Sequence, residues 1–193
     1  MLLQNLQKYK IILASKSPRR HQLLSDLGLK FIVQSMDIAE DIPEEMGMTE
    51  VPVYLAELKA LAFLPQLKNN QLVITADTIV WLNGKILNKP ADYNDGFRML
   101  KDLSGEKHQV LTGVCLLTTD KKVSFFASTD VWFKPLSDEE INYYLGTYRP
   151  YDKAGAYGIQ EWIGYIGIDH IEGSFFNVMG LPVQSLYEHL KVF

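Results

Sequence analysis

The chain has 193 residues, 47% of them hydrophobic and 22% charged, and its formal net charge at pH 7 is −4. This length and apolar content allow a core of ordinary size, so we predict a single domain over residues 1–193. The mildly acidic balance offers no broad basic surface and argues against a nucleic-acid binder, although a local cluster of Lys and Arg could still hold a small polyphosphate.

Apolar periodicity and turn residues predict strands and helices that follow one another along the chain. In chain order we predict a strand over 10–14, a helix from 18 to a stop at 28, a helix over 51–64, strands over 72–76, 79–82 and 85–87, a helix over 93–103, strands over 109–118 and 123–133, a helix from 137, short strands within 154–178 and a helix over 183–191. Segment 37–48 is acidic and interrupted by Pro43 and Gly47, so we expect an exposed loop there.

Local signals support several of these boundaries. Asp92 is a suitable N-cap, Ser137 with Glu140 matches a capping box, and Asn83-Gly84 favours a two-residue hairpin turn. The mixture of strands and helices predicts an α/β or α+β fold around a largely mixed sheet.

Several kinds of protein are disfavoured by what these residues lack. Residues 1–8 contain no continuous apolar run of signal-peptide length, and no later stretch is long enough to cross a bilayer. The single cysteine, Cys115, allows no disulfide framework, and its apolar neighbours predict a buried thiol without a catalytic role. We therefore expect a cytoplasmic protein with a small-molecule partner and no membrane contact.

Segment 15–20, Ser-Lys-Ser-Pro-Arg-Arg, follows an apolar strand and opens a predicted helix. Ser17 is a good N-cap and Pro18 suits the first helical position, which puts Arg19 and Arg20 where the helix dipole favours anions. Backbone N–H groups, two hydroxyls and two guanidinium groups would converge there, and phosphate oxygens suit that arrangement. The alternative is an ordinary capped surface helix with solvated arginines.

Asp77 is a carboxylate inside an apolar β run, where it costs free energy unless it is paired, hydrogen-bonded or bound to a cation. The predicted hairpin could bring Lys89 back toward Asp77, and Lys59 could approach from the helix over 51–64. Two ammonium groups near one carboxylate suit a triphosphate with a divalent metal, for which Glu40 is a candidate second ligand. The alternatives are a turn or bulge Asp that bonds its own backbone, and solvated surface lysines.

Segment 151–160 combines small and aromatic residues and ends at Gln160. Its glycines would let the backbone approach a ligand closely, and an amide side chain presents one donor and one acceptor in a plane. That pair complements N3–H and a carbonyl of thymine or uracil and fits cytosine less well. The alternative is a tight β turn with an exposed Gln160. The 4 histidines show no metal-ligand spacing, so we assign them no role.

Together these segments resemble the Maf family of nucleoside triphosphate pyrophosphatases, also called septum formation proteins. The resemblance covers nearly the whole chain and is carried by ASKSPRR (14–20), ADTIV (76–80), KP (89–90), LSG (103–105), HQVLTGV (108–114), DKAGAYGIQ (152–160) and GSFFNVMGLP (173–182). It implies a mixed sheet bent into two lobes around a nucleotide cleft, similar to inosine triphosphatases, and a homodimer.

The resemblance also implies hydrolysis between the α and β phosphates, giving a nucleoside monophosphate and pyrophosphate with Mg²⁺, Mn²⁺ or Co²⁺. The matching positions are Asp77 as proton acceptor and metal ligand, Ser15, Arg19, Lys59 and Lys89 on the phosphates, Glu40 at the metal or water, and Arg20, Thr78 and Gln160 as the trio associated with base preference. Thr78 and Gln160 resemble the branch that acts on dTTP and UTP, as distinct from the branch that acts on 7-methyl-GTP.

Two positions depart from the family pattern: Asn88 stands where Glu commonly precedes Lys-Pro, and Glu161 stands where Gly often follows the glutamine. The first could alter metal binding, and the second could alter the mouth of the base pocket. Two other functions fit the same residues. One is a house-cleaning pyrophosphatase for inosine, xanthosine or modified pyrimidine triphosphates, and the other is a nucleotide-sensing regulator of cell division.

Overall fold

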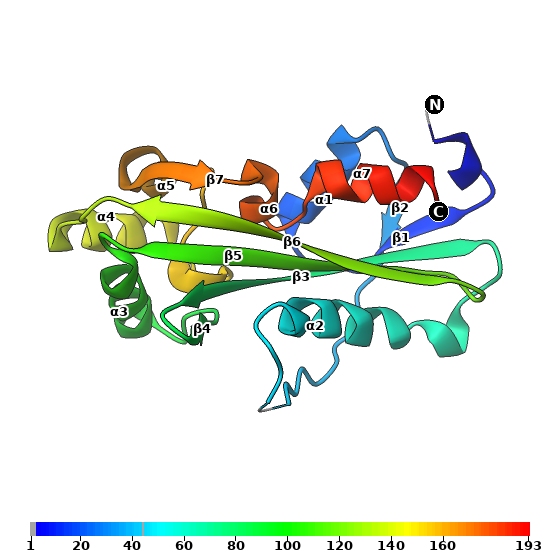
Figure 1. The fold of residues 1–193 in the computed structure, drawn as a ribbon, viewed down its shortest axis with the longest axis horizontal. Coiled ribbons are helices and arrows are strands. Elements are labelled where there is room, and N and C mark those ends of the chain that lie inside the picture. The colour runs from blue at the N-terminus through cyan, green and yellow to red at the C-terminus, as the bar shows by residue number, and fades with distance from the viewer. Residues whose placement is uncertain (1–2, 44) are drawn as a thin grey trace. The chain divides into compact units, whose positions relative to one another are not determined.

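The computed structural model describes residues 3–43 and 45–193 and confirms the predicted mixed α/β class (Figure 1). Seven strands of this described chain form one sheet in the order β2-β1-β3-β5-β6-β7, with β4 paired to β3. The strands are β1 (Lys10–Leu13), β2 (Phe31–Val33), β3 (Gln71–Leu82), β4 (Lys85–Leu87), β5 (Lys107–Leu117), β6 (Lys122–Phe133) and β7 (Ile168–Glu172). The α-helices are α1 (Pro18–Asp26), α2 (Glu50–Leu61), α3 (Tyr93–Leu103), α4 (Asp138–Tyr148), α5 (Trp162–Gly167), α6 (Phe175–Met179) and α7 (Val183–Lys191), and the 3-10 turns are η1 (Gln4–Leu6), η2 (Leu64–Gln66) and η3 (Ala154–Ala156).

The chain forms two compact units, and β3, β5 and β6 each contribute residues to both. The first unit comprises the described residues up to Asp77 together with Thr112–Ala127 and Gly180–Phe193. The second unit comprises Thr78–Leu111 and Ser128–Met179. The single domain, and the nucleotide cleft that the resemblance implies, stay predictions.

In the first unit, β1 lies between β2 and β3 and runs parallel to both, so that Ile12 stands opposite Ile32 and Val73. The β1 residues from Ile11 to Leu13 are all buried, as expected for a parallel strand that is covered on both faces. Figure 1 shows α2 over one face of this part of the sheet and α1 and α7 over the other.

The contact of α2 with the sheet is unusually close. The Thr75 hydroxyl on β3 donates to the Ala56 carbonyl of α2 at 2.6 Å. At Gly113 of β5, a Cβ atom would lie 2.2 Å from the Pro52 backbone, so only glycine permits this approach. These two contacts fix the position of α2 on the strands that it covers.

In the second unit, Asn83 and Gly84 both adopt positive φ, at 48° and 84°, and join β3 to β4 as the predicted two-residue hairpin turn. Leu100, Val131 and Tyr144 are fully buried in one apolar core shared by helices α3 and α4 and the neighbouring strands. No helix in the described ranges is long and apolar enough to cross a membrane.

Two helices, α3 and α7, have the predicted bounds. Helix α3 is capped as predicted, with the Asp92 side chain accepting the Asp95 N–H at 2.9 Å. The Ser137–Glu140 capping box is confirmed. Segment 37–48 is largely exposed, as predicted, although its Glu44 lies outside the described residues, as do Met1 and Leu2 of the amino-terminal segment.

Three predictions of secondary structure were wrong. Segment 154–178 contains one strand, β7, and otherwise consists of turns and the helices α5 and α6, which are too short for their periodicity to be recognised in the sequence. The helix predicted over 51–64 ends at Leu61, and the chain continues through Ala62 and Phe63 into the 3-10 turn η2. Pro65 has no N–H to donate to the Leu61 carbonyl, so the α-helical hydrogen bonds cannot continue through it. The two strands predicted on either side of Asp77-Thr78 are one continuous strand, β3.

Candidate functional site

The turn between β1 and α1 is organised by Ser15. Its hydroxyl accepts the Ser17 N–H at 3.1 Å, and its carbonyl accepts the ring Nε2–H of His21 at 2.6 Å. Ser17 occupies the predicted N-cap position and Pro18 follows it at the start of the helix, although the Ser17 side chain makes no capping hydrogen bond. The buried Ser15 hydroxyl thus holds the backbone that leads into the arginine-bearing end of α1.

Arg19 and Arg20, the two arginines predicted to bind phosphate, lie in the first turn of α1, which carries no acidic residue. The Arg20 Nε–H donates to the Gly180 carbonyl at 2.7 Å. Burial, opposed by the charges of Asp77 and Glu40 and reinforced by Arg19, lowers the pKa of Arg20 from its ordinary value. An arginine remains charged despite such a shift, so two cations stand at the positive end of a helix, where an anion is favoured.

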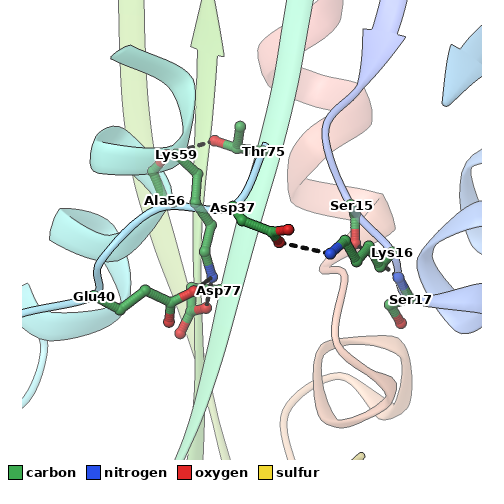
Figure 2. Close-up of polar contacts among 9 residues, drawn as sticks. All are labelled: Ser15, Lys16, Ser17, Asp37, Glu40, Ala56, Lys59, Thr75 and Asp77. Atoms are coloured by element: carbon green, nitrogen blue, oxygen red, sulfur yellow. Dashed lines mark hydrogen bonds and ion pairs between the residues drawn. The ribbon is translucent and has the colours of Figure 1, made fainter. Parts of the chain in front are cut away.

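Asp77, Lys59 and Glu40 form one cluster (Figure 2). The Lys59 ammonium donates to the Asp77 carboxylate and lies 3.1 Å from Glu40 Oε1. The side chains of Lys59 and Asp77 are only 20% and 14% exposed, whereas that of Glu40 is 47% exposed. Because β3 runs through Asp77 without interruption, the interpretation of Asp77 as a turn residue was wrong.

The sheet register explains how this cluster forms. Thr75 and Asp77 are two residues apart on β3, so their side chains project from the same face, the face that α2 covers. Lys59 follows Ala56 by one helical turn, and Ala56 is the residue that Thr75 bonds. The packing of α2 on β3 therefore brings the Lys59 ammonium to the Asp77 carboxylate.

Glu40 reaches the cluster from the loop that follows β2. Lys16 pairs with Asp37 of this loop at 2.6 Å, and both side chains are exposed. Figure 2 shows the loop extending from this pair near the Ser15–Ser17 turn to Glu40 beside Lys59. The loop is thus held at two points, and the better buried of the two is the one at Lys59.

The second unit holds the remaining predicted residues, Thr78, Lys89 and Gln160. Thr78 directly follows Asp77 on β3, and Lys89 is exposed. The Gly155 N–H donates to the Asn88 carbonyl at 3.1 Å, so the segment that ends at Gln160 is bonded to the residue before Lys89. The approach of Lys89 to Asp77 stays a prediction.

The family model described as "Maf-like protein" matches residues 10–193. The chain belongs to the Maf family.

Relatives over the whole length share one name. A "dTTP/UTP pyrophosphatase" of Parabacteroides distasonis is 55% identical over 193 residues, covering 100% of both chains. One of Porphyromonas gingivalis is 55% identical over 195 residues, covering 100% of this chain and 98% of its own, and one of Flavobacterium johnsoniae is 50% identical over 190 residues, covering 98% of each. Among solved structures, "The structure of the Staphylococcus aureus Ham1 protein" aligns with 64% of this chain and 71% of its own, at 18% identity and a TM-score of 0.43.

The donor set of this Maf chain suits a metal that is shared with a substrate. In the described residues, no three His, Cys, Asp or Glu side chains gather into a metal site. Glu40 and Asp77 offer carboxylate oxygens around Lys59. Mg²⁺ is commonly held by one or two carboxylates together with substrate phosphates, so these two residues fit such an ion.

Reasoning from the sequence missed a second polar cluster, formed by Tyr144, Lys153 and Glu161 in the second unit. The sequence feature that could have indicated this cluster is the pair of opposite charges, Lys153 and Glu161, at the two ends of a glycine-rich and aromatic segment. Cys115 is buried, as predicted, and burial raises the pKa of its thiol, which keeps it protonated and unreactive.

Proposed function

We propose that this chain is a nucleoside triphosphate pyrophosphatase that hydrolyses dTTP and UTP to the nucleoside monophosphate and inorganic pyrophosphate (diphosphate). The observation that carries the proposal is the cluster of Asp77, Lys59 and Glu40, held by α2 packing in the same unit as the two arginines of α1. The full-length relatives named dTTP/UTP pyrophosphatase support the choice of substrate.

In the proposed reaction, a water oxygen bonds to the α phosphorus while the bond from this phosphorus to the bridging oxygen breaks and pyrophosphate leaves. Asp77 accepts the proton of the water, and the Lys59 ammonium fixes the orientation of the Asp77 carboxylate. Arg19, the Ser15 turn and Lys89 hold phosphate oxygens, which neutralises charge and aligns the attack. Positioning and electrostatic stabilisation carry most of such a reaction, because phosphoryl transfer needs little covalent help.

A divalent cation, Mg²⁺, Mn²⁺ or Co²⁺, completes the proposal. Glu40 and Asp77 would hold it, together with the substrate phosphates. When bound, such an ion neutralises phosphate charge and lowers the pKa of water.

Recognition of the substrate nucleobase is assigned to Gln160, with Thr78 and Arg20. Gln160 Oε1 is buried and has no hydrogen-bond partner among the described residues. An acceptor in this state costs about 1–3 kcal/mol, and the N3–H of thymine or uracil would satisfy it. Cytosine has no hydrogen at N3, so the same amide would discriminate against dCTP. This supports a preference for dTTP and UTP.

The direct test is pyrophosphate release from a panel of natural and modified triphosphates with each of the three metals. We expect the highest kcat/KM with dTTP and UTP. Faster hydrolysis of inosine or xanthosine triphosphate would replace the substrate assignment, and tight binding without product from any triphosphate would replace the enzyme with a nucleotide sensor.

We also propose that the chain acts in the cytoplasm and, as its resemblance to the family implies, as a homodimer. Light scattering after size exclusion should give twice the chain mass of 22.0 kDa. Cell fractionation should recover the protein with cytoplasmic markers. A monomer mass, or recovery with another compartment, would contradict the corresponding part of this proposal.

A further inference from the structure

A chain of hydrogen bonds surrounds the segment that carries Gln160. The Gly158 N–H donates to the Tyr144 hydroxyl at 3.0 Å, and this hydroxyl donates to Glu161 Oε2. The Lys153 ammonium pairs with the other oxygen, Glu161 Oε1, at 3.0 Å. A single side chain of α4 therefore joins the backbone at Gly158 to the side chain of Glu161, and Lys153 at the beginning of the segment pairs with the same carboxylate.

The segment has little regular structure of its own to fix its conformation. After the short turn η3, the chain from Tyr157 to Gln160 forms neither helix nor strand. A Cβ atom at Gly158 would lie 2.9 Å from the Glu161 carboxyl carbon and 3.1 Å from Lys153 Cε, so these side chains pack directly on the backbone. The Tyr165 hydroxyl donates to the Gln160 carbonyl at 2.8 Å. The Glu161 N–H donates to the Gly158 carbonyl at 3.0 Å, so the backbone is held at Gly158, Gln160 and Glu161.

The cluster is buried well enough for its geometry to matter. Tyr144 is fully buried, and the side chains of Lys153 and Glu161 are 9% and 19% exposed. Burial, followed by the hydrogen bond to Glu161, raises the pKa of the Tyr144 hydroxyl, which therefore stays protonated and remains a donor. A buried ion pair is weak evidence for stability, but it fixes one arrangement when every partner is satisfied.

We propose that Tyr144, Lys153 and Glu161 are positioning residues for base selection: they hold the backbone on both sides of Gln160 and so fix the direction of its amide. This inference rests on the proposed role of Gln160. It gives Glu161, where the family often has glycine, a defined part in this chain. A misplaced Gln160 amide would no longer distinguish the N3–H donor of thymine or uracil from the N3 acceptor of cytosine. Binding of the phosphates, which is assigned to other residues, would be retained.

The test compares kcat/KM for dTTP and dCTP in two variants, Tyr144→Phe and Glu161→Gln. The first removes one hydroxyl and keeps the ring, and the second keeps the shape and removes the charge. Tyr143→Phe is the matched control, because Tyr143 lies on the same helix and is exposed. We expect the dTTP/dCTP ratio to fall about tenfold in both variants, as expected for the loss of about one hydrogen bond of discrimination. The kcat for dTTP and the control ratio should stay within about threefold of wild type.

Hydrogen exchange without nucleotide is the second readout. The backbone amides of residues 154–165 should exchange faster than in wild type in both variants, and their exchange should be unchanged in Tyr143→Phe. Gln160→Ala then separates the two claims. If it abolishes the ratio while Tyr144→Phe and Glu161→Gln keep it, the positioning role is wrong and the function of Gln160 stands. If Gln160→Ala keeps the ratio, the assigned base contact and this inference both fail. Should Tyr144→Phe not fold, Glu161→Gln alone decides.

Discussion

Replacing Asp77 by Asn tests the centre of the proposed mechanism. The substitution keeps the size of the side chain, and the amide oxygen can still accept a hydrogen bond from Lys59. Lys59 also keeps its pairing with Glu40 at 3.1 Å, so its ammonium is not left without a charged partner. Because the side chains are partly exposed, we expect a loss of unfolding free energy of at most about 1–2 kcal/mol.

The effect on catalysis should be much larger than the effect on stability. An amide cannot accept the proton of the attacking water, and such general-base help contributes roughly 10²- to 10⁴-fold. This factor corresponds to about 3–5 kcal/mol of transition-state stabilisation. We therefore expect kcat to fall at least about 100-fold, while the midpoint of thermal unfolding shifts by only a few degrees.

The assay is pyrophosphate release at saturating dTTP, with thermal unfolding measured on the same preparation. Asp138→Asn is the matched control: it makes the same chemical change and also removes an ion pair, with Lys101, but the Asp138 side chain is exposed and has no part in the proposed site. Turnover of Asp77→Asn close to that of Asp138→Asn would remove Asp77 from the mechanism.

Two further substitutions test the structure around the site. Gly113→Ala places a Cβ atom 2.2 Å from the Pro52 backbone and should displace α2, which lowers the free energy of unfolding by about 1–3 kcal/mol and reduces dTTP hydrolysis. The control is Gly146→Ala on α4, which should be neutral or stabilising because nothing lies within 4 Å of the added Cβ atom. Equal stability of the two variants in urea unfolding would contradict the packing argument. Burial, opposed by Asp130, lowers the pKa of His108 to about 3. The unfolded state takes up this proton at a higher pH than the folded state. The free energy of unfolding is therefore unaffected by His108 above pH 6.5 and falls by about 1.4 kcal/mol per pH unit from there down to about pH 3. Urea unfolding of wild type and His108→Gln should diverge in slope across this range, and parallel profiles would refute it.

The sequence predicted features that depend on neighbouring residues. The bounds of α3 follow from an Asp92 side chain that accepts a backbone N–H three residues later. Asp77 could be singled out because a carboxylate inside an apolar run needs a partner. Ser17 was likewise placed correctly at the N-cap of α1 from the proline that follows it, although its side chain makes no capping hydrogen bond.

Features set by distant contacts could not be predicted in the same way. The partner of Asp77 could be suggested only by residue type, because Lys59 meets Asp77 through the packing of Ala56 on Thr75 and of Pro52 on Gly113. The cluster of Tyr144 with Glu161 joins residues from separate elements and has no spacing signal. Family resemblance supplied roles for single residues, but the contacts that hold those residues follow from the fold.

Charge balance links the carboxylates of the first unit to the need for a cation. The site residues there are the carboxylates Glu40 and Asp77 and the cations Lys59, Arg19 and Arg20, so positive charge exceeds negative charge only slightly. A triphosphate brings several more negative charges than this excess can neutralise. Glu40 and Asp77 would repel the phosphates, and a divalent cation held by these carboxylates would offset that repulsion. A phosphate site without metal would be better served by neutral residues at both positions, so the two carboxylates favour the proposal that the triphosphate is bound together with a divalent cation.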